Sequence, residues 1–497
     1  MAINDYNVTD DIARWSARRP EHPALVAGDR IIDYGGLEAL VAQSAGWLTQ
    51  RGIGLGSSVA ICITDPVKHV VVTLALARLG VTQFGFMAAA LGNAAVTMMM
   101  KAGCTAIVTD IASLTIAGAR RISIEESWLA DGDAPPPRSG DGDLPCMVTM
   151  SSGTTAEPKL IMVTHRQLHG RMVSAGAMGF DAQDRFLSLL DLGALVQRSM
   201  VVRALMSGAT VHLAALEAAL DIAAYCGRHR ITAIFALPFM VSTWLRTAPP
   251  GADIALPHVR KLVLAGSTVT RPDFEQAVER LTPNIFVAYG SNELGTASFA
   301  DPAMRRRFPL SIGRLSAGVE AEIVDESDRP VGVGEVGRIR IRTPGMITGY
   351  PDQPGLNDYH FRAGWFYPGD LASCNAEGVL LFHGRADDMM IFNGNNIYPC
   401  EIEAALEGHP AVGEAAAFPW RSRVHQDIPV AAVVARAPTD EAALLAFGRT
   451  ILGLRAPRRI FLVDRLPRNA MGKVVKQHLA AELGKALGSP ADGAAAG

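Results

Sequence analysis

The chain has 497 residues, of which 49% are hydrophobic and 19% are charged, and its formal net charge is -3 at pH 7. This length and composition predict a large packed core and more than one domain. A chain with no basic excess is a poor candidate for binding nucleic acid or for a polybasic membrane anchor.

The first residues, MAINDYNVTDDIARW, carry acidic side chains and no continuous apolar run, unlike a secretory signal. The cysteines lack the close paired spacing of zinc sites or disulfide frameworks. Reduced, mostly buried thiols and a cytoplasmic location are therefore expected. The cysteines are Cys62, Cys104, Cys146, Cys226, Cys374 and Cys400.

The first 140 residues alternate short apolar runs with helical stretches, as at 58–63 and 68–79. This alternation predicts an α/β region with parallel strands. The uncharged stretch Leu79 to Met100 has the length of a membrane span, but glycines and polar residues interrupt it. We expect a short strand, a turn and the start of a helix there, and no membrane span.

A polar, proline-rich connection at 131–145 leads into a predicted buried strand, CMVTM. The segment Ser151 to Lys159, SSGTTAEPK, follows that strand directly. Its hydroxyls, backbone N–H groups and lysine are suited to holding phosphate oxygens. It lacks the glycine that precedes Lys-Ser/Thr in a Walker A loop. The alternative is a solvated turn with satisfied hydroxyls.

A second cluster, Ala288 to Glu293, follows the predicted strand NIFVA. Tyr289 offers a ring for a nucleobase, Gly290 and Ser291 a tight turn, and Glu293 a carboxylate. Magnesium prefers one or two carboxylates combined with phosphate oxygens, so Glu293 is a candidate metal ligand. A turn at a strand end with a solvated glutamate is the alternative.

Three further segments carry candidate functional residues. Asp370 follows a Pro-Gly turn and is placed to accept hydrogen bonds from vicinal ribose hydroxyls, unless it is an ordinary turn aspartate. The stretch 384–403 runs from a charged junction through a hairpin to a helix start. Lys473 lies on a glycine-containing loop just before a predicted helix, Val474 to Leu483.

From about Gly318 onward, alternating strands such as VEAEIVDE and GRIRIRT predict a β-rich subdomain. Gly332 to Gly337 fits G-x-G-x-x-G in spacing only, because a strand and not a helix follows it. A small α/β unit then closes the chain. Its small, nearly uncharged tail cannot bury enough apolar surface to order itself.

In their order and spacing, the five segments resemble the motif set of the acyl-adenylate-forming superfamily, which includes acyl-CoA synthetases, peptide-synthetase adenylation domains and luciferases. The resemblance spans at least Cys146 to Lys476. It implies an α/β fold whose large N-terminal domain, 1–386, combines layered α/β sheets with a β-subdomain. A small mobile α+β domain, 387–485, and a disordered tail, 486–497, would follow.

The resemblance also implies roles for individual residues. Lys473, Thr154 and Glu293 would be catalytic, with Glu293 holding magnesium. Asp387 would be the hinge between the domains, and Gly394 would sit on a hairpin lining a thiol tunnel. The nucleotide would be bound by Ser151, Ser152, Gly153, Thr154, Thr155, Lys159, Gly266, Ser267, Tyr289, Gly290, Ser291, Asp370, Arg385 and Lys473.

The implied reaction activates a carboxylic acid with ATP and passes the acyl group to coenzyme A or to the phosphopantetheine of a separate carrier protein. Magnesium and Lys473 would offset the repulsion between the acid and the anionic α-phosphate. The apolar segments around Asp191, Gly193 and Pro238 favour an apolar or aryl acid. Gly193 stands where many acyl-CoA synthetases have an aromatic or histidine gate.

Two alternatives remain open at this point. Asp191 would hold a substrate ammonium group in an enzyme that adenylates an amino acid. Ala156 and Leu160 stand where glycines are common in the phosphate loop, which is also consistent with a catalytically silent nucleotide-binding protein.

Overall fold

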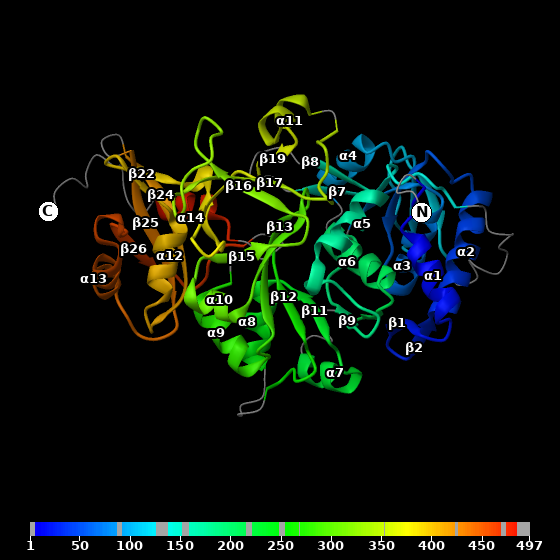
Figure 1. Cartoon of the computed structure of the whole chain (residues 1–497), viewed down its shortest axis with the longest axis horizontal. Coiled ribbons are helices and arrows are strands. Elements are labelled where there is room, and N and C mark those ends of the chain that lie inside the picture. The colour runs from blue at the N-terminus through cyan, green and yellow to red at the C-terminus, as the bar shows by residue number, and fades with distance from the viewer. Residues whose placement is uncertain are drawn as a thin grey trace.

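The computed structural model describes residues 5–86, 92–125, 138–151, 159–214, 221–247, 254–267, 269–351, 353–422, 426–468 and 474–484. All structural statements below concern these residues. Figure 1 shows the amino-terminal part of the chain at one end of the long axis and the carboxyl-terminal unit at the other. The central strands, among them β13, β15 and β17, lie between them.

The first α/β layer is a six-stranded sheet in the order β6-β5-β3-β4-β7-β8. Its inner strands β3, β4 and β5 are short and mostly buried, as expected where helices cover a parallel sheet, whereas the edge strand β6 exposes two arginines. Neighbours pair parallel except β7 and β8. The bounds are β3 Ser58–Cys62, β4 Thr82–Gly85, β5 Ala106–Thr109, β6 Arg120–Ser123, β7 Pro145–Ser151 and β8 Lys159–Thr164.

The second sheet has 15 strands within the described residues, and its strand pairing changes from parallel to antiparallel along its length. Strands β1, β10, β9, β11, β12 and β13 are adjacent and parallel. These strands are β1 Pro23–Ala27, β9 Arg185–Ser188, β10 Thr210–Leu213, β11 Ala233–Ala236, β12 Lys261–Leu264 and β13 Ile285–Ser291. The hairpin strand β2, Arg30–Asp33, closes this edge by pairing antiparallel with β1.

Antiparallel pairing begins at β14, Gly295–Ala300, and continues through the β-rich part of the same sheet. The sequence pattern placed the start of the β-rich part at about Gly318, but the change comes earlier, because β14 folds back directly on β13. The other strands are β15 Ser311–Leu315, β16 Glu320–Val324, β17 Gly337–Arg342, β18 Phe361–Arg362, β19 Trp365–Phe366, β20 Asp370–Cys374 and β21 Leu380–Arg385.

Helices cover the sheets, and several of them begin where the sequence supplies a capping group. Asp33 caps α2, and Asp65 caps α3 with a proline in the first turn. Thr164 and Gln167 form a capping box at α5. The helices of the large unit are α1 Thr9–Arg18, α2 Tyr34–Gln50, α3 Pro66–Arg78, α4 Asn93–Lys101, α5 His165–Ser174, α6 Leu195–Met206, α7 Ile222–His229, α8 Pro238–Thr247, α9 Arg271–Arg280, α10 Pro302–Arg307 and α11 Pro354–His360.

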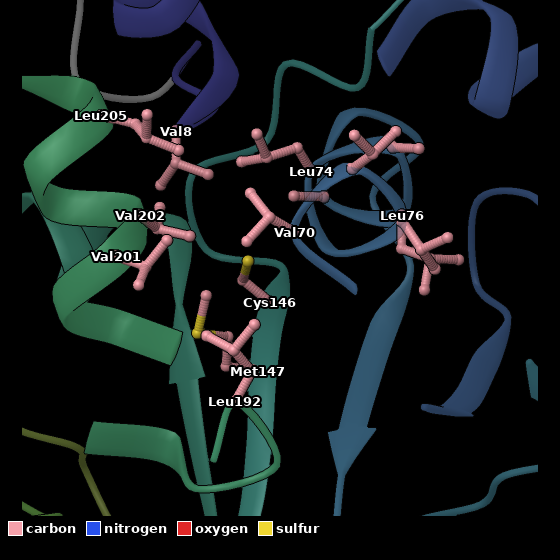
Figure 2. Packing of buried hydrophobic residues seen from close by; sticks show 14 of the residues in the cluster. Val8, Val70, Leu74, Leu76, Cys146, Met147, Leu192, Val201, Val202 and Leu205 are labelled. Carbon is pink, nitrogen blue, oxygen red and sulfur yellow. The ribbon is translucent and has the colours of Figure 1, made fainter. Parts of the chain in front are cut away.

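The largest hydrophobic cluster joins the two layers. Figure 2 shows Val201, Val202 and Leu205 of α6 facing Val70 and Leu74 of α3, with Cys146 and Met147 of β7 between them. Each of these side chains is at most 2% exposed. Both layers therefore share one core, and α6 is held rigidly against β7.

The carboxyl-terminal unit has a five-stranded sheet containing the order β23-β22-β25-β24, with β26 beside β25. Figure 1 places it beside α8, α9 and α10 of the large unit. Where the two units meet, the thiol of Cys400 donates to the carbonyl oxygen of Phe382 on β21 at 3.7 Å. Its elements are β22 Met390–Phe392, β23 Asn395–Ile397, α12 Pro399–Glu407, β24 Val412–Ser422, β25 Gln426–Ala435, α13 Glu441–Leu452, β26 Arg459–Leu462 and α14 Lys476–Gly484.

The fold class predicted from the sequence is confirmed: layered α/β sheets, a β-rich part and a small α+β unit are all present. The apolar stretch after Leu79 contains β4 and the start of α4, and no described helix is long and apolar enough to cross a membrane. Gly332 to Gly337 connects β16 to β17, as expected. All six cysteines are free thiols.

Candidate active site

Three predicted nucleotide ligands meet although they are far apart in the sequence. The hydroxyl of Tyr289, at the end of β13, donates to Oδ2 of Asp370 at 2.5 Å. Arg385 donates from Nη1 to the other oxygen, Oδ1, at 3.2 Å. Asp370 opens β20 and Arg385 ends β21, and the two are direct cross-strand partners. Because each oxygen of the Asp370 carboxylate accepts a hydrogen bond, the orientation of this side chain is fixed.

The electrostatics of this triad favour a charged carboxylate beside a neutral phenol. Burial and the negative charge of Asp370 raise the pKa of Tyr289 well above its usual value. Burial works against the charged form of Arg385, but Asp370 and Asp387 outweigh it and raise the pKa of the guanidinium. Asp370, only 8% exposed, therefore keeps two charge-stabilising donors.

Glu293 lies in the tight turn between β13 and β14. Gly290 makes this hairpin close, since a Cβ there would come within 2.1 Å of the carbonyl oxygen of Gly295. Arg171 of α5 also holds the turn, because it donates a hydrogen bond to the carbonyl oxygen of Asn292 at 2.8 Å. Tyr350 donates its hydroxyl to Oε1 of Glu293 at 2.9 Å. The backbone and one carboxylate oxygen of the turn are thus both fixed.

Lys159, the first residue of β8, approaches the same carboxylate. Its Nζ lies 5.1 Å from the centre of the Tyr350 ring and 3.2 Å from Nε2 of His360. Burial lowers the pKa of this lysine, and the negative charge of Glu293 works in the opposite direction. The structure therefore brings the last residue of the predicted phosphate loop next to the predicted metal ligand.

The remaining pocket residues gather at one edge of the parallel sheet. Asp191 and Gly193 follow β9, Pro238 follows β11, and Gly266 and Ser267 follow β12. These strands are neighbours of β13, so their carboxyl ends open on the same edge as Tyr289. Asp191 is exposed, but its Oδ1 already accepts the backbone N–H of Gly193 at 2.7 Å.

The predicted hinge residue lies in the connection between the two units, and the predicted tunnel residue lies on a hairpin of the carboxyl-terminal unit. Asp387 is exposed in a 3₁₀ turn, 386–388, and accepts a hydrogen bond from Nε of Arg385 at 3.3 Å. Gly394 has φ +78° at the tip of the β22–β23 hairpin, a conformation that suits glycine. Lys476, at the start of α14, pairs with Glu403 at 2.7 Å.

Several predicted residues lie outside the described part of the chain. These are Ser152, Gly153, Thr154, Thr155 and Lys473, together with Ala156. Ser151 ends β7, although nothing can be said of its side chain. The strands on either side of the predicted phosphate loop, β7 and β8, pair up to Ser151 and Lys159.

Sequence reasoning missed three residues that organise the site: Arg171, Tyr350 and His360. Arg171 is 5% exposed, and burial lowers its pKa to about 9. A buried arginine that binds backbone carbonyls leaves no distinctive pattern in a helix such as α5. Tyr350 directly follows Gly349 after a strand, and that weak turn signal is all the sequence offered.

Comparison with known proteins agrees with this geometry. Residues 12–351 match the AMP-binding enzyme family, and residues 401–473 match the AMP-binding enzyme C-terminal domain. The chain belongs to the AMP-binding enzyme family. The resemblance drawn from the five motifs is thereby confirmed, and the matched segments lie on either side of Asp387.

Within the AMP-binding enzyme family, similar proteins are ligases that act on aromatic acids. The 2-succinylbenzoate–CoA ligase of Bacillus subtilis is 25% identical over 479 residues, which cover 93% of this chain and 95% of that protein. The 3-hydroxybenzoate–CoA ligase of Aromatoleum sp. is 28% identical over 497 residues, covering 92% and 93%. Both similarities run through the large unit and the small one.

Solved structures of the AMP-binding enzymes share the fold. The o-succinylbenzoate CoA synthetase of Bacillus subtilis in complex with its acyl-adenylate intermediate superposes with a TM-score of 0.82 at 24% identity. The alignment covers 94% of this chain and 97% of that one. The same synthetase was solved with ATP and a magnesium ion, again with a TM-score of 0.82.

Proposed function

We propose that this protein is an AMP-forming acid–thiol ligase that joins an aryl carboxylic acid to coenzyme A. In the first step an oxygen of the acid bonds to the α-phosphorus of ATP, and the bond from that phosphorus to pyrophosphate breaks. In the second step the sulfur of coenzyme A bonds to the acyl carbon, AMP leaves, and the thiol proton passes to solvent.

The observation that carries this proposal is the meeting of Tyr289, Asp370 and Arg385. An aspartate with both oxygens fixed in direction is suited to vicinal ribose hydroxyls, which can each donate one hydrogen bond. The ring of Tyr289 lies 6.2 Å from that of Phe382, so the aromatic surface for a base is also fixed. Nucleotide recognition follows from these three side chains together.

The charge distribution supports transfer at the α-phosphate. A carboxylate that approaches an anionic phosphate needs positive charge nearby. Lys159 supplies one such charge within the described residues, and we propose that Lys473 supplies another during adenylation. Arg385 forms ion pairs with Asp370 and Asp387. Its proposed role is therefore to orient the Asp370 carboxylate toward the ribose hydroxyls.

Magnesium fits Glu293 on the evidence of its surroundings. Tyr350 occupies Oε1, and no other hydrogen bond to this carboxylate occurs among the described residues, so Oε2 remains for a cation. The described chain holds no cluster of three or more metal-ligating side chains. Magnesium is commonly bound through one or two carboxylates combined with phosphate oxygens. When bound, magnesium would neutralise charge on the phosphates.

The acid and the acceptor are inferred from the relatives and the pocket edge. The ligases similar to this chain are named for 2-succinylbenzoate, 3-hydroxybenzoate and ferulate, and each is named for coenzyme A. Gly193 and Pro238 are buried and apolar at the edge where the acid would lie. We therefore propose an aryl acid, and coenzyme A in preference to a carrier protein.

We also propose that the chain divides at Asp387 into an adenylation domain, 1–386, and a lobe, 387–485, that turns between the two steps. The exposed 3₁₀ turn at 386–388 is the connection between β21 and β22, and few residues would need to change their backbone angles there.

The proposal is tested by acid-dependent exchange of labelled pyrophosphate into ATP, run against panels of aryl, fatty and amino acids. Exchange with aryl acids followed by formation of the coenzyme A thioester is the expected result. Exchange with amino acids alone would favour the amino-acid alternative. Binding of ATP without exchange for any acid would favour a catalytically silent protein.

Lys473→Ala tests the proposed chemistry directly. Loss of one charge-stabilising group costs about 10²- to 10³-fold in rate, so exchange should fall by that factor. Thioester formation from supplied acyl adenylate should persist, because the bond that breaks in that step joins the acyl carbon to an oxygen of AMP, and no bond to phosphorus is made or broken. Lys476→Gln is the matched control, since this nearby lysine pairs with Glu403 and the amide keeps a hydrogen bond. Equal loss of both steps in Lys473→Ala would contradict the role.

A further inference from the structure

His360 is a buried histidine between Lys159 and the aromatic side chains of the β-rich part. It ends α11 and is 7% exposed. Its ring stacks on Phe366 with centroids 5.8 Å apart and meets the ring of Tyr350 edge-on at 5.8 Å. Packing on both sides leaves the ring little freedom to rotate.

The hydrogen bonds of His360 fix which ring nitrogen carries the proton. Nδ1 lies 2.7 Å from the carbonyl oxygen of Tyr367, which only accepts, so Nδ1 carries a hydrogen. Nε2 lies 3.2 Å from Nζ of Lys159, and an ammonium group only donates. In the neutral ring, Nε2 therefore accepts a proton of Lys159.

Tyr350 completes the environment of Lys159 and connects it to Glu293. The Lys159 ammonium lies 5.1 Å from the centre of the Tyr350 ring, within range of a cation–π interaction. The hydroxyl of the same ring donates to Oε1 of Glu293 at 2.9 Å. His360 and Tyr350 thus hold Lys159 from two sides, and one of these sides is tied to the candidate metal ligand.

The charges around His360 keep it neutral near pH 7. Burial lowers its pKa, as do the positive charges of Lys159 and Arg385, while the Tyr367 carbonyl and Glu293 act in the opposite direction. Tyr350, whose ring contacts His360, stays uncharged because burial and the negative charge of Glu293 raise its pKa above the usual value, and the ring of Tyr359 packs edge-on against His360 at 4.8 Å. A proton on Nε2 would remove the acceptor and place a second cation beside Lys159.

We propose that His360 is a positioning residue, which aims the ammonium of Lys159 at the phosphates of ATP when neutral and lets it go when protonated. This inference rests on the proposed function, in which Lys159 contacts ATP. It predicts that the affinity for ATP, and not for the acid or coenzyme A, falls as the pH drops well below the ordinary pKa of histidine, because burial lowers the pKa of His360.

The test compares His360→Leu, which removes the acceptor, with His360→Gln, whose amide oxygen can take the place of Nε2 but does not titrate. A charge-assisted hydrogen bond contributes about 1.5 to 3 kcal/mol, so His360→Leu should raise KM for ATP by about 10-fold or more at neutral pH. KM for the acid and for coenzyme A should change less than about twofold.

His360→Gln should keep KM for ATP within about threefold of wild type at neutral pH. When kcat/KM for ATP is plotted against pH, this variant should lack the decrease that wild type shows at acidic pH. The matched control is His383→Gln. This histidine is also buried, 8% exposed, with its pKa lowered by burial, and its Nε2 lies 2.9 Å from the hydroxyl of Ser373. Its removal should leave the acid fall in place.

Two results would overturn the inference: an unchanged KM for ATP in His360→Leu, or an acid fall in His360→Gln as steep as in wild type. Thermal unfolding of each variant identifies any loss of folding, and the Gln variant stays informative if the Leu variant does not fold. Wild type without acid-dependent exchange would refute the proposed function instead. Calorimetric titration of wild type and both variants with ATP at two pH values would then still test His360.

Discussion

The hydroxyl of Tyr289 is the most informative single group to remove. Tyr289→Phe keeps the ring against Phe382 and deletes only the hydrogen bond to Asp370, which measures 2.5 Å. Hydrogen bonds to a charged group contribute about 1.5 to 3 kcal/mol. Asp370 keeps Arg385 at 3.2 Å, so it is not left as an unpaired buried charge, and the lower half of this range applies.

If the hydroxyl serves to orient Asp370 toward the ribose, losing this hydrogen bond should mainly weaken nucleotide binding. About 1.4 kcal/mol corresponds to a tenfold change, so KM for ATP should rise by about 10-fold in pyrophosphate exchange. KM for the acid should stay within about twofold, because the acid does not touch this triad in the proposed scheme.

Tyr34→Phe is the control that separates lost stability from lost affinity. The buried hydroxyl of Tyr34 donates to the carbonyl oxygens of Leu205 and Ala209, at 3.0 and 2.9 Å. Ala209 directly precedes β10, and three strands of the sheet separate β10 from β13, which carries Tyr289. This variant should lower the midpoint of thermal unfolding and leave KM for ATP unchanged. A Tyr289→Phe enzyme with KM for ATP within twofold of wild type would refute the reasoning.

Two further predictions concern backbone positions. Gly290→Ala should destabilise the β13–β14 hairpin by about 1 to 3 kcal/mol in urea unfolding, since its Cβ meets the carbonyl of Gly295, while Gly355→Ala, with open space around it, should not. Asp387→Pro should spare pyrophosphate exchange and stop thioester formation, because a 3₁₀ turn accepts the φ that proline fixes and the lobe could no longer turn. Retention of both activities would remove Asp387 from the scheme.

The sequence predicted much of the local structure because the relevant signals are local. The apolar run CMVTM lies within β7, all of NIFVA except its first residue lies within β13, and the charged junction followed by a hairpin corresponds to 386–397. The strand after Gly332 to Gly337 was also predicted correctly. The start of the antiparallel region was placed too late, since β14 carries no clear alternation of its own.

The candidate site was predicted in its residue types and not in its contacts. Tyr289 and Glu293 were selected from one motif, Asp370 and Arg385 from two others, and their roles remain proposals. His360 was not selected, because a histidine at a helix end is common and gains meaning only when Lys159 lies 3.2 Å away. Its partner comes from a strand that is 201 positions earlier in the chain.

The sequence by itself determined which segments become strands and helices and which side chains carry chemistry, since propensity, capping and hydrophobic periodicity act over a few residues. Only the tertiary structure decided which of these side chains meet. The pairing of Asp370 with Arg385 depends on the register of β20 and β21, and that of Tyr289 with Asp370 on the order of strands in the large sheet. Strand order and register are set by packing of the whole core, which no local pattern encodes.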